Sequence, residues 1–334
     1  DGTVGVGYQA LSALTSGAKN IAIGYQSMLV ATAATNNVAI GYDSLNAIVG
    51  DVAGNAGNYN VAIGVDSMGA VNAGTHNSAR ADYNVAIGQQ ALFGGTFTAA
   101  DKQIQGNVAV GANALDGSGV NEIEDCVAIG YAALSGSVEA TALGTVAIGR
   151  SALLALTSGT GNVAIGYQAL DAEDTGDYNT AIGYRSLSAL NYDGSGYNTA
   201  VGFKTLEVAT SGIENVAVGG NAGLLLQTGD QNVIVGNGAG TATVDVDSSV
   251  IIGCNAAQGV MTSAADGTVA IGHSALAALS SGIGNTAVGY QCLDGTDDGA
   301  YNTAVGYSSL SANCGDENTA VGYYALLYTT GSGN

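Results

Sequence analysis

The chain has 334 residues and a formal net charge of −21 at pH 7, with only six basic residues. This charge argues against nucleic acids and anionic membranes as partners, because both repel an acidic surface. Apolar residues make up 47% of the chain, but they occur in short runs, well below the roughly 18 residues of a membrane-spanning helix. The 53 glycines and the absence of proline argue against a helical protein and suit a parallel sheet.

One short phrase recurs along the whole chain, and its clearest copy is Asn-Val-Ala-Ile-Gly-Tyr-Gln-Ala-Leu at residues 162–170. We count 18 copies, each aligned on its central glycine, which we call the index glycine. The commonest spacing between successive index glycines is 17 residues. A fixed period over an entire chain is typical of a solenoid. The sequence therefore predicts an all-β fold, a parallel β-solenoid or β-roll of about 18 coils, which forms one domain over residues 1–334.

The residues before the index glycine predict a short strand. Val, Ile or Thr stands three residues before it, Ile or Val stands directly before it, and Ala usually lies between them. The β-branched residues share one face of the strand, which we expect to be the core. Ala and Gly leave the opposite face smooth, and we expect this strip to lie at the axis of a parallel homotrimer. The alternative is that Ala and Gly face a thin core within one chain.

The residues after the index glycine predict a second short strand, because a small residue and then Leu or Met follow at fixed positions. Two ladders are expected from stacked coils. Asn four residues before the index glycine forms a polar ladder that includes Asn20, Asn37, Asn60, Asn84, Asn107, Asn162 and Asn179. The aromatic residue after the index glycine forms a second ladder that includes Tyr25, Tyr42, Tyr167 and Tyr184, with His273 in an equivalent place.

Coil length varies along the chain. Residues 1–44 are regular, whereas the coils within 45–107 are lengthened by three insertions, at 46–59, 69–83 and 93–106. All three follow the Leu/Met position, so they predict lateral loops on one side, where repeat proteins often bind partners; neutral decoration is the alternative. The candidate surface-binding residues are His76, Arg80, Phe93, Phe97 and Lys102.

Residues 108–334 are regular again, except near 219–257, where coils lose both Tyr and Leu. This loss predicts a thinner region and a candidate bend.

Catalytic chemistry is not indicated. No Ser–His–Asp or Cys–His set stands out from the repeat, so we expect no enzyme and no cofactor. Loop carboxylates at Asp171, Glu173, Asp174 and Asp177 are the best candidates for calcium, although neither the EF-hand nor the calcium-roll spacing is present. The cysteines at 126, 254, 292 and 314 form no CxxC pair. We therefore expect small buried residues rather than a zinc site or a disulfide framework.

The motif resembles the NTAIGYQAL-type repeats of phage tail fibres and bacterial surface fibres, most clearly at Asn302–Tyr307 and Asn162–Leu170. Its Ala-Ile-Gly element is similar to the β-roll heads of trimeric autotransporter adhesins. The resemblance implies a homotrimeric structural shaft, extracellular or on a virion, that presents loops to a cell-surface glycan or protein. Because both chain ends fall inside motif copies, we expect a segment of a longer fibre. The alternative is a self-polymerising extracellular filament subunit with no receptor site.

Overall fold

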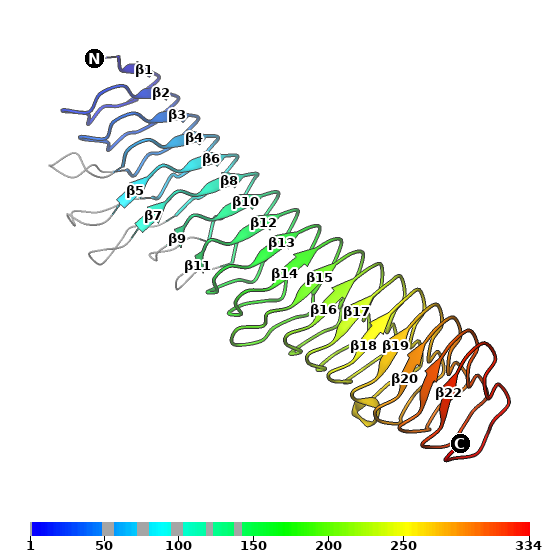
Figure 1. Ribbon diagram of the computed structural model, residues 1–334. Helices are drawn as coiled ribbons and strands as arrows, with labels where there is room; N and C mark the ends of the chain where they lie inside the picture. Colours follow the sequence, from blue (N-terminus) through cyan, green and yellow to red (C-terminus); the bar gives the residue numbers. More distant parts are fainter. Residues whose placement is uncertain (1, 49–56, 72–79, 95–102, 118–122, 137–141) are drawn as a thin grey trace. The chain divides into compact units, whose positions relative to one another are not determined.

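The computed structural model describes residues 2–48, 57–71, 80–94, 103–117, 123–136 and 142–334. The chain divides into two compact units, Asp1–Asp177 and Tyr178–Asn334. Each unit is a stack of parallel coils in which one three-residue strand per coil pairs with its neighbour (Figure 1). The predicted parallel β-solenoid of mostly 17-residue coils is therefore confirmed.

Unit 1 contains a parallel sheet whose strands pair in chain order and in register, so that Val4 faces Ile21 and Ala22 faces Ala39. Its strands are β1 (Val4–Val6), β2 (Ile21–Ile23), β3 (Val38–Ile40), β4 (Val61–Ile63), β6 (Val85–Ile87), β8 (Val108–Val110), β10 (Val127–Ile129), β12 (Val146–Ile148) and β13 (Val163–Ile165).

Unit 2 repeats this arrangement, and Thr180 of its first strand faces Thr199 of the second. Its strands are β14 (Thr180–Ile182), β15 (Thr199–Val201), β16 (Val216–Val218), β17 (Val233–Val235), β18 (Val250–Ile252), β19 (Val269–Ile271), β20 (Thr286–Val288), β21 (Thr303–Val305) and β22 (Thr319–Val321). A single 3₁₀ turn, η1 (Ser263–Ala265), lies between β18 and β19.

The strand faces the core with its alanine, so the predicted orientation is wrong. Ala22 is fully buried, whereas Ile21 and Ile23 on either side are 37% and 39% exposed. The reason is the size of the residue across the coil. In the first coil, a Cβ built on Gly5, which holds the alanine position, would lie 3.5 Å from Cδ1 of Leu11. The leucine fills the thin interior and leaves room only for alanine, while Val and Ile supply strand propensity on the outer face.

The predicted second strand is also absent from the described coils, and a turn takes its place. Gln26 and Met28, two and four residues after Gly24, have φ angles of 53° and 52°. Their N–H groups still bond between coils, to the carbonyls of Tyr8 at 2.9 Å and Ser44 at 3.0 Å. In a strand, the successive residues Ser27 and Met28 would point to opposite faces. The alternating left-handed backbone allows both to be fully buried.

The index glycines are required by the distance between coils. Gly272 has a φ of +139°, and a Cβ built on it would collide with the carbonyl oxygen of Gly289 in the next coil. Only glycine therefore permits both this backbone conformation and this close approach.

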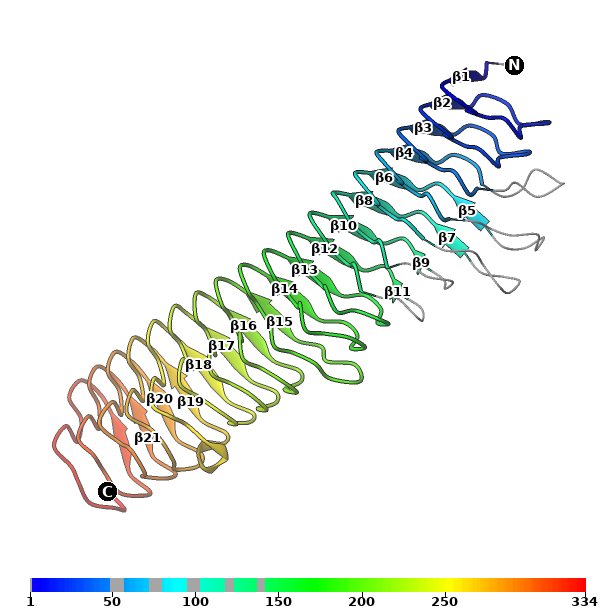
Figure 2. The same ribbon diagram turned by 180° about the vertical axis from the view of Figure 1, so that it is seen from behind.

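A second sheet, which the sequence analysis missed, covers part of unit 1. Four short parallel strands form it in the order β11 (Ala142–Leu143), β9 (Ile123–Glu124), β7 (Gln103–Gln105) and β5 (Arg80–Asp82). They lie beside the main strands in both views (Figures 1 and 2). Their inward residues Ala81, Ile104, Ile123 and Ala142 are fully buried. The predicted lateral insertions thus contribute β5 and β7 to the wall of the coil.

In two of the three coils within residues 219–257, those of Gly236 and Gly253, the lost leucine volume is replaced from the strand. Ile234 and Ile251 occupy the buried alanine position there, and β16 to β19 remain paired in register. A Cβ built on Gly240, at the leucine position, would lie 3.4 Å from Cδ1 of Ile251 and 3.5 Å from Cδ1 of Ile234. The small and large residues have therefore exchanged sides of the core.

This exchange is testable in one coil. We expect Ile234→Ala to lower the free energy of unfolding by about 2–5 kcal/mol, because it leaves a cavity. Adding Gly240→Leu restores the common Ala/Leu pattern, and the φ of 55° at Gly240 lies within the range that the repeat's leucines adopt. The double variant should regain most of the loss. Urea unfolding monitored by circular dichroism measures this, and additive losses in the double variant would contradict it.

Candidate functional site

The asparagine ladder is internal and joins the coils. Nδ2 of Asn37 donates to Oδ1 of Asn20 at 3.2 Å, and the backbone N–H of Asn37 donates to the same oxygen at 3.1 Å. Asn60, Asn84 and Asn107 continue this pattern in unit 1. Asn162 donates to the Gly176 carbonyl at 2.6 Å, and Asn179 accepts from Asn198 at 3.1 Å. All these amides are buried, so the ladder stabilises the stack and offers no surface.

The aromatic ladder lies outside. The rings of Tyr25 and Tyr42 stack with centroids 5.0 Å apart, and Tyr184 stacks on Phe203 at 5.4 Å. His273 stacks on Tyr290 at 5.2 Å, in the place that the repeat gives to tyrosine. Tyr25, Tyr42, Tyr167 and Tyr184 are all exposed. The ladder therefore presents groups of stacked, exposed rings rather than one continuous stripe, since Ala112 and Arg150 interrupt it.

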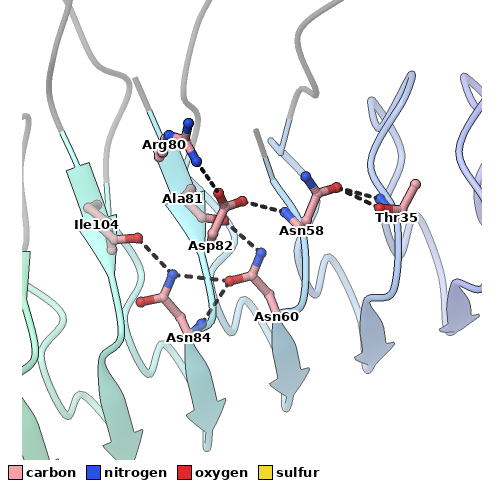
Figure 3. Close-up of polar contacts among 8 residues, drawn as sticks. All are labelled: Thr35, Asn58, Asn60, Arg80, Ala81, Asp82, Asn84 and Ile104. Carbon is pink, nitrogen blue, oxygen red and sulfur yellow. Dashed lines mark hydrogen bonds and ion pairs between the residues drawn. The ribbon is translucent and has the colours of Figure 1, made fainter. Parts of the chain in front are cut away.

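A further polar ladder, six residues before the index glycine, was not predicted (Figure 3). Oδ1 of Asn58 accepts from the backbone N–H and the hydroxyl of Thr35, at 2.8 and 2.9 Å. The buried carboxylate of Asp82 accepts from the N–H of Asn58 at 2.7 Å and lies 4.0 Å from Arg80. The sequence signal was a short polar side chain at one fixed offset, which the variable coil length obscured.

Two of the five predicted loop residues, Arg80 and Phe93, lie within the described residues. Arg80 is exposed at the start of β5 and pairs with Asp82. Phe93 is half-buried after the turn that follows β6, and its carbonyl accepts from the N–H of Ala70 at 2.9 Å. His76, Phe97 and Lys102 lie outside the described residues. The structure thus places Arg80 and Phe93 on different parts of the coil.

A hollow of about 340 Å³ lies on the insertion side of unit 1, lined by Tyr83, Gln105, Gly106, Glu124 and Asp125. Its residues follow the strands β5, β7 and β9 or end them. Tyr83 offers an aromatic face, Gln105 an amide, and Glu124 and Asp125 two carboxylates. This set can hold a polar or cationic group, and it lacks a nucleophile paired with a base. The sequence pattern does not predict this hollow, because Gly106 ends the insertion at 93–106, which predicts a loop.

Two of the four carboxylates considered for calcium are used within the protein. Glu173 is fully buried, and its Oε1 accepts from the N–H of Gly176 at 2.7 Å. Oδ1 of Asp177 accepts from the N–H of Thr160 at 2.7 Å. In the part of the chain that the structure describes, no three His, Cys, Asp or Glu side chains are grouped so that they could hold a metal ion.

The cysteines are free, and Cys126, Cys292 and Cys314 are buried as expected. Cys254 is exposed, so the prediction was wrong there: it stands in the outer aromatic ladder. Burial raises the pKa of the Cys126 and Cys292 thiols to about 11. These two thiols therefore remain protonated and unreactive in the folded protein at neutral pH.

Thiol labelling distinguishes these environments. At pH 8 we expect Cys254 to react quickly with a water-soluble maleimide, and Cys254→Ser to abolish the fast reaction. Cys126 and Cys292 should react only after unfolding.

The same shifts make stability depend on pH. Unfolded thiols ionise near their ordinary pKa of 9.0, while the folded ones ionise near 11. Their contribution to the free energy of unfolding is therefore complete below about pH 9 and is lost as the pH rises towards 11.

In the labelling experiment, fast reaction of Cys126 in the native protein would contradict its burial.

No known family and no curated protein matches the sequence. Within the described ranges, no helix has the length and apolar character needed to cross a membrane.

Proposed function

We propose that the chain is a structural segment of a fibre, a shaft or adhesin part on a virion or cell surface that presents its insertion side for attachment. The observation that supports this most is the unbroken row of bonds between coils within each unit. Backbone groups of each coil, and buried asparagines in most coils, bond to the next coil, so that similar modules join end to end. Modules of this kind derive their stability from neighbours and extend without a new fold.

The likeness of the motif to tail-fibre and adhesin repeats supports the same proposal. It favours attachment to a host glycan or surface protein as the purpose of the insertion side. The exposed cation Arg80 and the hollow beside Tyr83 both lie on that side, on β5 and immediately after it.

We also propose that the chain assembles as a parallel homotrimer, through a different surface from the one first expected. The alanine strip is buried within each chain and is not available. The exposed apolar surface consists instead of the outward Val and Ile residues, such as Ile23 and Ile40, and the adjacent stripe of Tyr25 and Tyr42. Apolar surfaces that continue over many coils usually mark an interface.

Light scattering at two protein concentrations tests the assembly. A fixed mass of three chains is the expected result. We expect Ile23→Lys with Ile40→Lys to give single chains with an unchanged circular dichroism spectrum, because lysine on the outer face opposes burial in an interface but not folding. For comparison with this double variant, Val305→Lys replaces one exposed residue of the outer face in unit 2.

Two outcomes would contradict the trimer. A mass of one chain at both concentrations would do so and leave a monomeric shaft. A mass that increases with concentration would favour the self-polymerising filament.

A further inference from the structure

The hollow beside Tyr83 is a missing rung in a short aromatic ladder. The rings of Tyr59 and Tyr83, each five residues before an index glycine, stack with centroids 5.0 Å apart and an angle of 8°. The equivalent residue in the next coil is Gly106. Tyr83 therefore stacks on a ring on one side and meets no side chain from Gly106 on the other. The ring is 54% exposed.

The backbone at the missing rung keeps the conformation of its neighbours. The φ angles are 59° at Tyr59, 61° at Tyr83, 70° at Gly106 and 55° at Asp125. The flanking strands also remain in register, with Ala81 opposite Ile104 and Ile104 opposite Ile123. The backbone thus has the conformation that carries a side chain in the neighbouring coils, and Gly106 supplies none. The depth of the space left there is one coil spacing, about 4.8 Å, which suits a single planar group.

The wall opposite Tyr83 is acidic. A Cβ built on Gly106 would collide with Oδ1 of Asp125, so this carboxylate reaches to the edge of the space that a side chain at residue 106 would enter. Glu124 lines the same hollow with a second carboxyl group, and Gln105 adds an amide. The volume of about 340 Å³ is at the lower end of the range for small-molecule sites.

We infer that this hollow binds a guanidinium group, the planar cation of an arginine side chain or of a small guanidine compound. The face of the tyrosine ring attracts a cation. A guanidinium is flat enough to stack there, and its fork of N–H donors matches a carboxylate. An ammonium ion carries the same charge but does not fill a planar slot. The net charge of −21 also attracts cations to the surface. This inference does not depend on the fibre proposal.

Titration calorimetry with N-acetyl-arginine amide tests the inference. The controls are N-acetyl-lysine amide, which has the charge without the plane, and N-acetyl-citrulline amide, which has the plane without the charge. We expect the arginine compound to bind at least about tenfold more tightly than either, a difference equivalent to about 1.4 kcal/mol. Added salt should weaken its binding. Equal binding of citrulline, or no arginine binding at 10 mM, would overturn the inference.

Variants locate the site. Gly106→Tyr fills the empty rung and should weaken arginine binding at least about tenfold. Its matched control is Gly267→Tyr, at the same position of a unit 2 coil, where φ is +67° and no atom lies within 4 Å. That control should bind like the unaltered protein. The nearly isosteric pair Glu124→Gln with Asp125→Asn should also abolish binding, and it provides the test if Gly106→Tyr fails to fold. Unchanged binding in either variant would overturn the site.

Two further probes distinguish a small guanidine compound from an arginine side chain within a polypeptide. Agmatine represents a small free compound, and the peptide Gly-Gly-Arg-Gly-Gly represents a polypeptide. Similar affinities for both mean that the guanidinium alone is recognised. A peptide that binds at least tenfold more tightly means that the site recognises arginine within a chain. Binding of neither probe contradicts the inference.

Discussion

The stacking of one coil directly on the next is the constraint on which the rest of the structure depends. A three-residue strand cannot bury its own polar backbone or its own apolar side chain, so every coil relies on its neighbour. Close stacking explains the index glycines, because a Cβ on Gly272 would collide with the carbonyl of Gly289. It also explains the buried asparagines. Each amide satisfies donors in the adjoining coil that would otherwise be costly to bury.

The thin interior follows from the same constraint. Across each regular coil, one alanine from the strand meets one leucine or methionine from the turn. Where the leucine becomes Gly240, isoleucine replaces alanine at positions 234 and 251. The volume is conserved where Ile251 meets Ala257 and nearly conserved where Ile234 meets Gly240, and volume-conserving exchanges are those that packed cores tolerate best. The outer face is free of this restriction and carries the aromatic ladder.

The fold was predictable from the sequence because the period is a property of the chain alone. The direction of the strand was not, since both of its faces are apolar and only the size of the opposing residue decides which points inward. Leu11, six residues after Gly5, held that information, but its inward direction depends on a left-handed backbone that leucine rarely adopts. The second sheet was hidden by insertions of unequal length. Its signal was an apolar residue three positions before the residue of the asparagine ladder, as at Ala81 before Asn84 and Ile104 before Asn107.

The candidate site was predictable only in part. The insertions indicated the correct side of unit 1, and Arg80 lies there. The hollow depends instead on Gly106, which has no side chain at the position that Tyr59 and Tyr83 hold in the two preceding coils. Such a vacancy becomes visible only when coils of different length are aligned in space. Tyr59, Tyr83, Gly106 and Asp125 then appear as successive members of one row.

The orientation of the strand is the central claim, and labelling of two adjacent cysteine variants tests it most directly. In a Cys254→Ser background, Ala217→Cys and Val218→Cys place a thiol on the two faces of β16. The structure predicts that a water-soluble maleimide labels residue 218 in the folded protein and residue 217 only after unfolding, because Ala217 is buried and Val218 is exposed. Rapid labelling at 217 with protection at 218 would contradict the account.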